Sequence, residues 1–186
     1  MTVTSLDPKT ALIVVDLQKG IVPRPLAPPM DGVVKRAVAL AEAFRGRGLP
    51  VVLVNVAGAA PGRTEQPRVR QAPQPGWTDL IPELNRQPRD HVVTKHTPGA
   101  FTNTGLEAHL KALGVSQVVI VGVATSNGVE VTARQAYELG FNVTLASDAM
   151  TDPRAEAHAY SIERVFPRIG ETGATDEIIG LLEKAA

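Results

Sequence analysis

Residues 117–140 read QVVIVGVATSNGVEVTARQAYELG, and this stretch decides the fold class. An apolar, β-branched run leads directly into a glycine-containing turn, which is followed by an amphipathic helix that stops at Gly140. A strand, a tight turn and a helix in this order direct a catalytic group, or the free N–H groups of a helix start, toward a ligand. The turn contains Ser126, Asn127 and Gly128, so the residue at position 128 limits which chemistry is possible.

The same alternation of strands and helices extends over the rest of the chain. We expect strands at 11–15, 51–56, 91–94, 117–121, 142–146 and 168–170, and helices at 31–46, 104–113, 127–139, 152–165 and 175–182. Strands separated by helices predict right-handed βαβ units. The expected fold is therefore α/β, a three-layer α/β/α domain over 1–186 with a mostly parallel six-stranded sheet. The irregular segment 57–76 is long for a connection and is interpreted as a surface loop or a substrate lid.

Composition narrows the classes of function. Lys plus Arg equals Asp plus Glu at 19 each, so no net field favours binding to nucleic acid or to an anionic membrane. The chain contains no cysteine, which excludes disulfides, thiolate catalysis and cysteine-ligated metals. No apolar run reaches the roughly 18 residues of a membrane span, and the N-terminus lacks signal-peptide features. We expect a cytoplasmic protein with a small-molecule substrate.

Open α/β sheets bind ligands beyond the carboxyl ends of their strands. The polar residues expected there are Asp16 and Gln18 after the first strand, Lys95 and His96 after the third, the 122–128 turn after the fourth, and Asp148 and Asp152 after the fifth. A carboxylate directly after a buried strand is partly desolvated, which raises its pKa and suits it to proton transfer. The plain alternatives are that Asp16 caps a turn and that Lys95 is a solvated surface lysine.

Three segments then identify a family by resemblance. ALIVVDLQKG (11–20), VVTKHTPGAF (92–101) and VIVGVATSNGVEVTARQAYELGFNVTLASDAMTD (119–152) resemble the isochorismatase-like hydrolases, which include nicotinamidases and N-carbamoyl amidases. The resemblance implies a homodimer or homotetramer, Asp16 as the catalytic carboxylate and Lys95 as the catalytic lysine. It also implies a cis Val123–Ala124 bond that orients oxyanion-stabilising backbone groups. The expected substrate-binding residues are Gln18, Phe101, Val123, Ala124, Thr125, Asn127 and Val129, the last through its N–H together with that of Gly128.

The chain departs from the family pattern at position 128. Most members place a nucleophilic cysteine there, whereas this chain has Gly128, so the covalent route to amide hydrolysis is closed. The isochorismatases proper also carry glycine here and cleave a vinyl ether without a covalent intermediate. Transferred to this chain, Asp16 would protonate the vinyl carbon, Lys95 would stabilise charge, and Gly128 would leave room for the substrate. Isochorismate, which releases pyruvate, is the leading candidate substrate.

Two alternatives stay open. The first is an amidase scaffold that lost its cysteine and now only binds a ligand. The second is a serine hydrolase with Ser126 in a variant nucleophile elbow and with Asp148 and His158 following in chain order, although His158 falls within a predicted helix. Either Arg63 or Arg68 could bind a substrate carboxylate, and the sequence does not choose between them.

No cofactor is expected. Nicotinamidase-like members hold a divalent ion with an Asp-x-His motif and a further histidine, but the equivalent segment NVAGAAPGR (55–63) has neither residue. The four histidines, at 91, 96, 109 and 158, show no metal-ligand spacing. P-loop and dinucleotide-binding motifs are also absent, so neither a metal nor a nucleotide is predicted.

Overall fold

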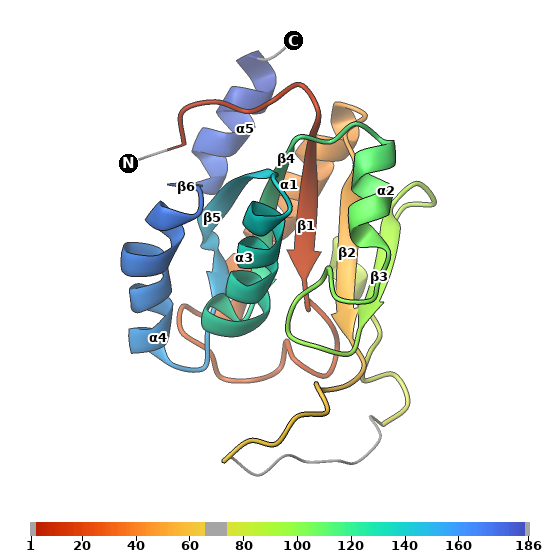
Figure 1. Cartoon of the computed structure of the whole chain (residues 1–186), viewed down its shortest axis with the longest axis vertical. Coiled ribbons are helices and arrows are strands. Elements are labelled where there is room, and N and C mark those ends of the chain that lie inside the picture. The colour runs from red at the N-terminus through yellow and green to blue at the C-terminus, as the bar shows by residue number, and fades with distance from the viewer. Residues whose placement is uncertain (1–2, 66–73, 185–186) are drawn as a thin grey trace.

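The computed structural model describes residues 3–65 and 74–184 (Figure 1). Six parallel strands form one sheet in the order β3-β2-β1-β4-β5-β6. The strands are β1 (Thr10–Val15), β2 (Val51–Val56), β3 (His91–Lys95), β4 (Gln117–Val123), β5 (Asn142–Thr151) and β6 (Glu171–Gly173). The helices are α1 (Met30–Gly46), α2 (Leu106–Ala112), α3 (Glu130–Glu138), α4 (Ala155–Tyr160) and α5 (Thr175–Lys184), with short helical segments η1 (Pro82–Leu84), η2 (Thr125–Val129), η3 (Ser161–Val165) and η4 (Phe166–Arg168).

Helices cover both faces of the sheet, as the three-layer prediction requires. In Figure 1, α2, α3 and α4 lie in front of the strands, and α1 and α5 lie behind them. The sequence of strand β1 is apolar throughout because its side chains alternate between two cores, one on each face of the sheet. Leu12 and Val14 pack in the core with α1 and α5, while Ile13 and Val15 pack in the core with α2 and α3.

Glycines end three of the helices at positions that the sequence indicates. Gly48, Gly114 and Gly140 follow α1, α2 and α3, and each has a positive φ, between 68° and 86°. This left-handed conformation lets the chain leave a helix without a steric penalty. The helical boundaries that were predicted from glycine are therefore close to the observed ones.

Two predicted strands need correction. The last strand lies at Glu171–Gly173 and not at 168–170, because Arg168 belongs to the helical segment η4. The fifth strand continues to Thr151 instead of ending at residue 146, since pairing with β4 resumes after a register shift between Ile120 and Gly122. Asp148 therefore lies inside β5 and not beyond its end. Of the irregular segment 57–76, residues 66–73 lie outside the described part of the chain.

The carboxyl ends of the strands meet at one edge of the molecule, the lower edge in Figure 1. Strand order reverses between β1 and β4, because the chain leaves β1 toward β2 on one side and leaves β4 toward β5 on the other. Such a switch point leaves a crevice between two diverging connections. Within the described residues, no helix is long and apolar enough to cross a membrane.

Candidate active site

Asp16 follows β1 directly and lies at the switch point. Its N–H donates to the Val54 carbonyl at 2.9 Å, which continues the pairing of β1 with β2. Its backbone has a φ of 55°, a left-handed conformation that is uncommon outside glycine, and residues of this kind cluster at functional sites. The residue is only 5% exposed. The end of β1 therefore directs a carboxylate into a position from which water is nearly excluded.

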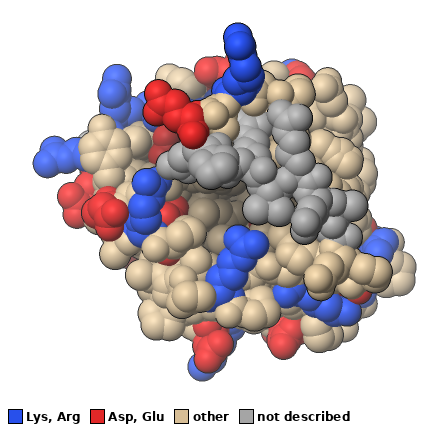
Figure 2. Space-filling view, turned by 90° about the horizontal axis from the view of Figure 1, so that it is seen from below, with Lys and Arg blue, Asp and Glu red and all other residues tan. Residues whose placement is uncertain are grey.

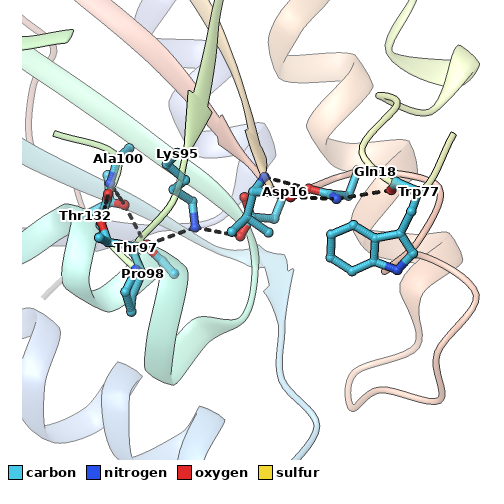
Figure 3. A network of polar contacts seen from close by, with 11 residues as sticks. Asp16, Gln18, Trp77, Lys95, Thr97, Pro98, Ala100 and Thr132 are labelled. Carbon is cyan, nitrogen blue, oxygen red and sulfur yellow. Dashed lines mark hydrogen bonds and ion pairs between the residues drawn. The ribbon is translucent and has the colours of Figure 1, made fainter. Parts of the chain in front are cut away.

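Lys95 is the last residue of β3 and reaches across the end of β2 to Asp16. Its Nζ donates to Asp16 Oδ2 at 2.8 Å and to the Pro98 carbonyl at 2.9 Å. Figure 3 shows the lysine extended from β3 toward the aspartate at the end of β1. The lysine side chain is 2% exposed, so the pair is buried as a unit. The plain readings of Asp16 as a turn cap and of Lys95 as a surface lysine are both wrong.

Burial of this pair changes the acidity of the Asp16 carboxyl group. Desolvation raises the pKa of Asp16 from 3.8 to about 6, although the charge of Lys95 and its hydrogen bond act in the opposite direction. Asp16 Oδ1 is buried and has no hydrogen-bond partner among the described residues. One carboxylate oxygen is thus held by the lysine, and the other is left without a hydrogen-bond partner. A carboxyl group in this state can donate a proton near neutral pH.

The backbone of Gly128 lies close to this carboxylate. A Cβ atom at this position would stand 2.8 Å from the Val123 carbonyl oxygen and 3.3 Å from Asp16 Oδ2. The first contact is closer than real Cβ atoms show, and its partner is backbone that cannot rotate away. The peptide bond between Val123 and Ala124, at the start of the turn, is cis. Glycine thus lets the turn approach Asp16 closely.

Two backbone donors of the turn are already engaged. The N–H groups of Asn127 and Val129 both donate to the Ala124 carbonyl, at 3.0 and 3.1 Å. Gly128 lies in the short helical segment η2 and lines the cavity, so its backbone borders the space that a substrate would occupy.

Two side chains hold the turn in place. The Thr132 hydroxyl donates to the Gly128 carbonyl at 2.6 Å and accepts the Ala100 N–H at 3.1 Å, which joins the turn to the loop after Lys95. On its other side, Asp152 Oδ2 accepts both the N–H and the hydroxyl of Ser126, at 2.8 and 2.7 Å. These contacts fix the turn relative to Asp16 and Lys95.

A cavity of about 490 Å³ opens onto these groups. It lies at the edge seen from below in Figure 2, where basic side chains border a hollow. Its size suits a small organic molecule. The lining residues are Asp16, Ile21, Arg24, Leu26, Val56, Gly58, Ala59, Ala60, Trp77, Lys95, Thr97, Pro98, Val123, Ala124, Asn127, Gly128 and Pro153.

Six of the predicted site residues line this cavity together. They are Asp16, Lys95, Val123, Ala124, Asn127 and Gly128. They come from segments that are far apart in the sequence, and the sheet order alone brings them to one place. The rule that ligands bind at the carboxyl ends of parallel strands accounts for this grouping.

The other four predicted residues lie outside the cavity lining. Gln18 is buried, and its amide joins the Val56 backbone to the Trp77 carbonyl, so it supports the cavity wall (Figure 3). Thr125 is buried and shares a 2.8 Å hydrogen bond with His158. Phe101 lies in a separate hollow beside α3 and packs with Phe141. Val129 belongs to the core and its N–H is already engaged, so it drops out of the set of substrate donors.

The three residues of the proposed serine hydrolase triad are bonded to other residues and not to one another. Ser126 is bonded to Asp152, whereas the histidine proposed as its base, His158, is bonded to Thr125. The proposed third member, Asp148, accepts the N–H and hydroxyl of Thr175 and pairs with Arg36. Ser126 therefore shapes the turn. In the described part of the chain, no three His, Asp or Glu side chains are grouped as a metal would require.

Among the lining residues that were not predicted, Arg24 is the charged one and Trp77 is the aromatic one. Of the arginines that were considered from the sequence, Arg63 is exposed and does not line the cavity, and Arg68 lies outside the described residues. A usable signal was present, because Arg24 lies in the proline-rich connection PRPLAPP (23–29) that follows the Asp16 strand. Loops after parallel strands carry binding residues.

Comparison with known proteins gives a family match over most of the chain. Residues 10–177 match the family model described as the isochorismatase domain. The isochorismatase family protein YecD of Escherichia coli O157:H7 is 39% identical over 180 residues, which cover 93% of this chain and 96% of that protein. The streptothricin hydrolase of Streptomyces noursei is 39% identical over 140 residues, covering 75% of this chain and 48% of the relative.

Solved structures show the same fold. An isochorismatase family protein from Burkholderia thailandensis superposes with a TM-score of 0.92 at 39% identity, covering 96% of this chain and 98% of that one. The family model extends over the Asp16 strand, the Lys95 strand and the Gly128 turn alike, and two of the likenesses are nearly full-length. The chain therefore belongs to the isochorismatase family.

Proposed function

We propose that this hydrolase works without a cysteine nucleophile and that Asp16 donates a proton to a small, carboxylate-bearing substrate. The observation that carries the proposal is the buried Asp16–Lys95 pair, which leaves Asp16 Oδ1 free beside a turn that has glycine at position 128. The chain has no thiol, so the covalent route of cysteine hydrolases is closed to it. Acid catalysis by Asp16 needs no such intermediate.

Isochorismate is the leading candidate substrate, and its hydrolysis balances with one acid. Protonated Asp16 gives its proton to the terminal vinyl carbon, and the adjacent carbon becomes an oxygen-stabilised cation. Water adds to that carbon and returns one proton to the Asp16 carboxylate. The hemiketal then collapses. The bond between this carbon and the ether oxygen attached to the ring breaks, and that oxygen takes up the remaining proton of the added water. The products are pyruvate and the ring alcohol.

The neighbours of Asp16 have separate tasks in this scheme. Lys95 stabilises the carboxylate that forms when Asp16 has given up its proton, because the two groups are only 2.8 Å apart. The N–H of Gly128, which lines the cavity beside the acid, binds an oxygen of the substrate. A side chain at position 128 would meet Asp16 Oδ2, so glycine keeps the path between acid and substrate open.

The test is pyruvate release from isochorismate by the purified protein, compared with the Asp16→Asn variant. The proposal expects release by the native protein and a loss on the order of 10³-fold in the variant, as removal of a general acid gives. Equal release by both would overturn acid catalysis by Asp16. No release by either would remove isochorismate as the substrate.

A ligand-binding protein on a retired amidase scaffold is the second candidate, and the lack of a nucleophile at position 128 is the observation that favours it. The two candidates differ in what Asp16→Asn does. In a working enzyme the variant binds substrate and no longer turns it over. In a binding protein no substrate is turned over by either form, and the substitution changes affinity only slightly.

A further inference from the structure

The cavity contains an unbalanced positive charge. Three charged side chains line it within the described residues: Asp16, Arg24 and Lys95. Asp16 and Lys95 are paired with each other at 2.8 Å. Arg24 therefore adds a positive charge that no lining carboxylate offsets, and a small anion is the ligand that this arrangement favours.

Arg24 is free to bind such an anion. It is exposed, and no carboxylate of residues 3–65 or 74–184 forms an ion pair with it. The sequence of 66–73, QPRVRQAP, contains no Asp or Glu. Lys95, by contrast, is nearly inaccessible and already donates to Asp16 and to the Pro98 carbonyl. Among the described residues that line the cavity, Arg24 is thus the cation that a substrate can reach.

The segment that carries Arg24 is held from both sides. The Arg24 N–H donates to the Ile21 carbonyl at 3.1 Å. Further along, Ala27 and Asp152 exchange two backbone hydrogen bonds, at 3.0 and 3.3 Å, and the Thr151 hydroxyl donates to the Pro28 carbonyl at 2.5 Å. Asp152 also holds the turn at Ser126 through its side chain. One residue therefore fixes both the Arg24 segment and the turn that carries Gly128.

We propose that Arg24 binds a carboxylate of the substrate while the group that reacts lies between Asp16 and the Gly128 N–H. This proposal rests on the proposed function and narrows the substrate class to molecules that carry a carboxylate apart from the bond to be cleaved. A guanidinium group presents parallel donors that match the two oxygens of a carboxylate, which a lysine cannot reproduce. Arg24 then selects the substrate and Asp16 performs the chemistry.

The experiment measures binding and does not depend on turnover. Cyclohex-1-ene-1-carboxylate and its carboxamide are titrated by calorimetry into the native protein and into Arg24→Gln, Arg24→Lys, Arg63→Gln and Asp16→Asn. Quenching of tryptophan fluorescence localises the binding, because Trp77 is the single tryptophan and lines the cavity. Arg63 is the matched control, as an exposed arginine that does not line the cavity.

We expect the native protein to prefer the carboxylate over the carboxamide by about tenfold or more, the range for a hydrogen bond to a charged group. Arg24→Gln removes the preference, Arg24→Lys keeps part of it, and Arg63→Gln keeps all of it. The proposal is overturned if the native protein shows no preference, if Arg24→Gln weakens both probes equally, or if Arg63→Gln has the same effect as Arg24→Gln.

The same titrations separate this proposal from the proposed function. Asp16→Asn removes a negative charge from the cavity, so it should bind the carboxylate at least as tightly as the native protein does. If Asp16→Asn retains both turnover and the preference for the carboxylate, acid catalysis fails and the anion site stands. If turnover depends on Asp16 while Arg24→Gln keeps the preference, the anion site fails and acid catalysis stands.

Discussion

The described part of the chain contains two buried pairs of an aspartate with a basic residue, and they differ in whether the aspartate is fully hydrogen-bonded. Asp90 receives Arg45 on both oxygens, at 3.2 and 2.7 Å, and also accepts the Gln87 N–H at 2.7 Å. Asp16 accepts a hydrogen bond from Lys95 on one oxygen, and its other oxygen has no partner among the described residues. A buried charge that is completely hydrogen-bonded holds the fold, whereas one left incomplete is held ready for a ligand.

The surroundings of the two pairs support this division. Arg45 also donates to the Leu84 carbonyl, so the first pair joins α1 to η1 and to the turn before β3. The second pair lines the cavity and adjoins the Gly128 turn. We interpret Arg45–Asp90 as structural and Asp16–Lys95 as catalytic. Four substitutions test the difference, taken from the largest expected effect to the smallest.

Asp16→Asn should abolish turnover with little effect on folding. We expect kcat to fall on the order of 10³-fold, because asparagine cannot donate the proton. Folding raises the pKa of Asp16 to about 6, so the native protein loses stability as pH rises from 3.8 through 6 while this carboxyl group ionises. At pH 8 removal of this unfavourably buried charge offsets the cost of leaving Lys95 without its partner, so we expect the free energy of unfolding of the variant to stay within about 1 kcal/mol of native, measured by urea denaturation. A larger loss would make Asp16 structural.

Asp90→Asn should have the opposite effect. It leaves the Arg45 guanidinium buried without its full partner, which typically costs about 3–5 kcal/mol. The melting temperature should fall by about 10 °C, while kcat per folded molecule stays native. The control is Asp79→Asn, which breaks the exposed Lys19–Asp79 pair and should change stability by less than about 1 kcal/mol. If kcat fell with Asp90→Asn in fully folded protein, the division between the two pairs would be wrong.

Lys95→Met should move the pH dependence of catalysis. Only the protonated form of Asp16 donates, so native kcat/KM should fall about tenfold per pH unit above a pKa of about 6. Lys95 lowers the pKa of Asp16, so its removal should shift this decline to higher pH, and Lys95→Arg should leave it nearly in place. A decline that moved to lower pH, or that stayed fixed in Lys95→Met, would contradict the assigned coupling.

Gly128→Ala should disturb the turn. The added Cβ would meet the Val123 carbonyl at 2.8 Å, and overpacking of this kind costs about 1–3 kcal/mol. Gly180→Ala is the control, because nothing lies within 4 Å of its Cβ position in α5, and alanine there should raise stability slightly. The same contact predicts that Gly128→Cys yields no amide hydrolysis, which an assay with amide substrates would check.

The fold was predictable because its signals are local. Continuous apolar runs such as Val51–Val56 indicate a sheet buried on both faces, and the glycines after α1, α2 and α3 indicate where these helices end. Asp16, Lys95 and Gly128 were predictable because each lies where a strand ends, and strand ends share one edge of a parallel sheet. Family resemblance then supplied their roles.

The rest depends on geometry that the sequence does not contain. The Gln18 amide is hydrogen-bonded to the backbone of Val56 and Trp77. Nothing in the sequence distinguishes such a glutamine from one that faces a ligand. Arg24 was missed because its place in the cavity depends on backbone bonds between Ala27 and Asp152, which are more than 100 residues apart. The last part of β5 was missed because its pairing depends on a register shift in β4.

The most direct test is the titration of the Asp16 carboxyl group itself, followed by NMR of protein with ¹³C-labelled aspartate side chains. The Asp16 signal is identified by its absence in Asp16→Asn. We predict that the Asp16 carboxyl group titrates with a pKa of about 6, far above the ordinary 3.8, because burial disfavours its charged form. A signal that titrates at or below 3.8 would show that Lys95 holds Asp16 fully ionised at neutral pH, and acid catalysis by Asp16 would be contradicted.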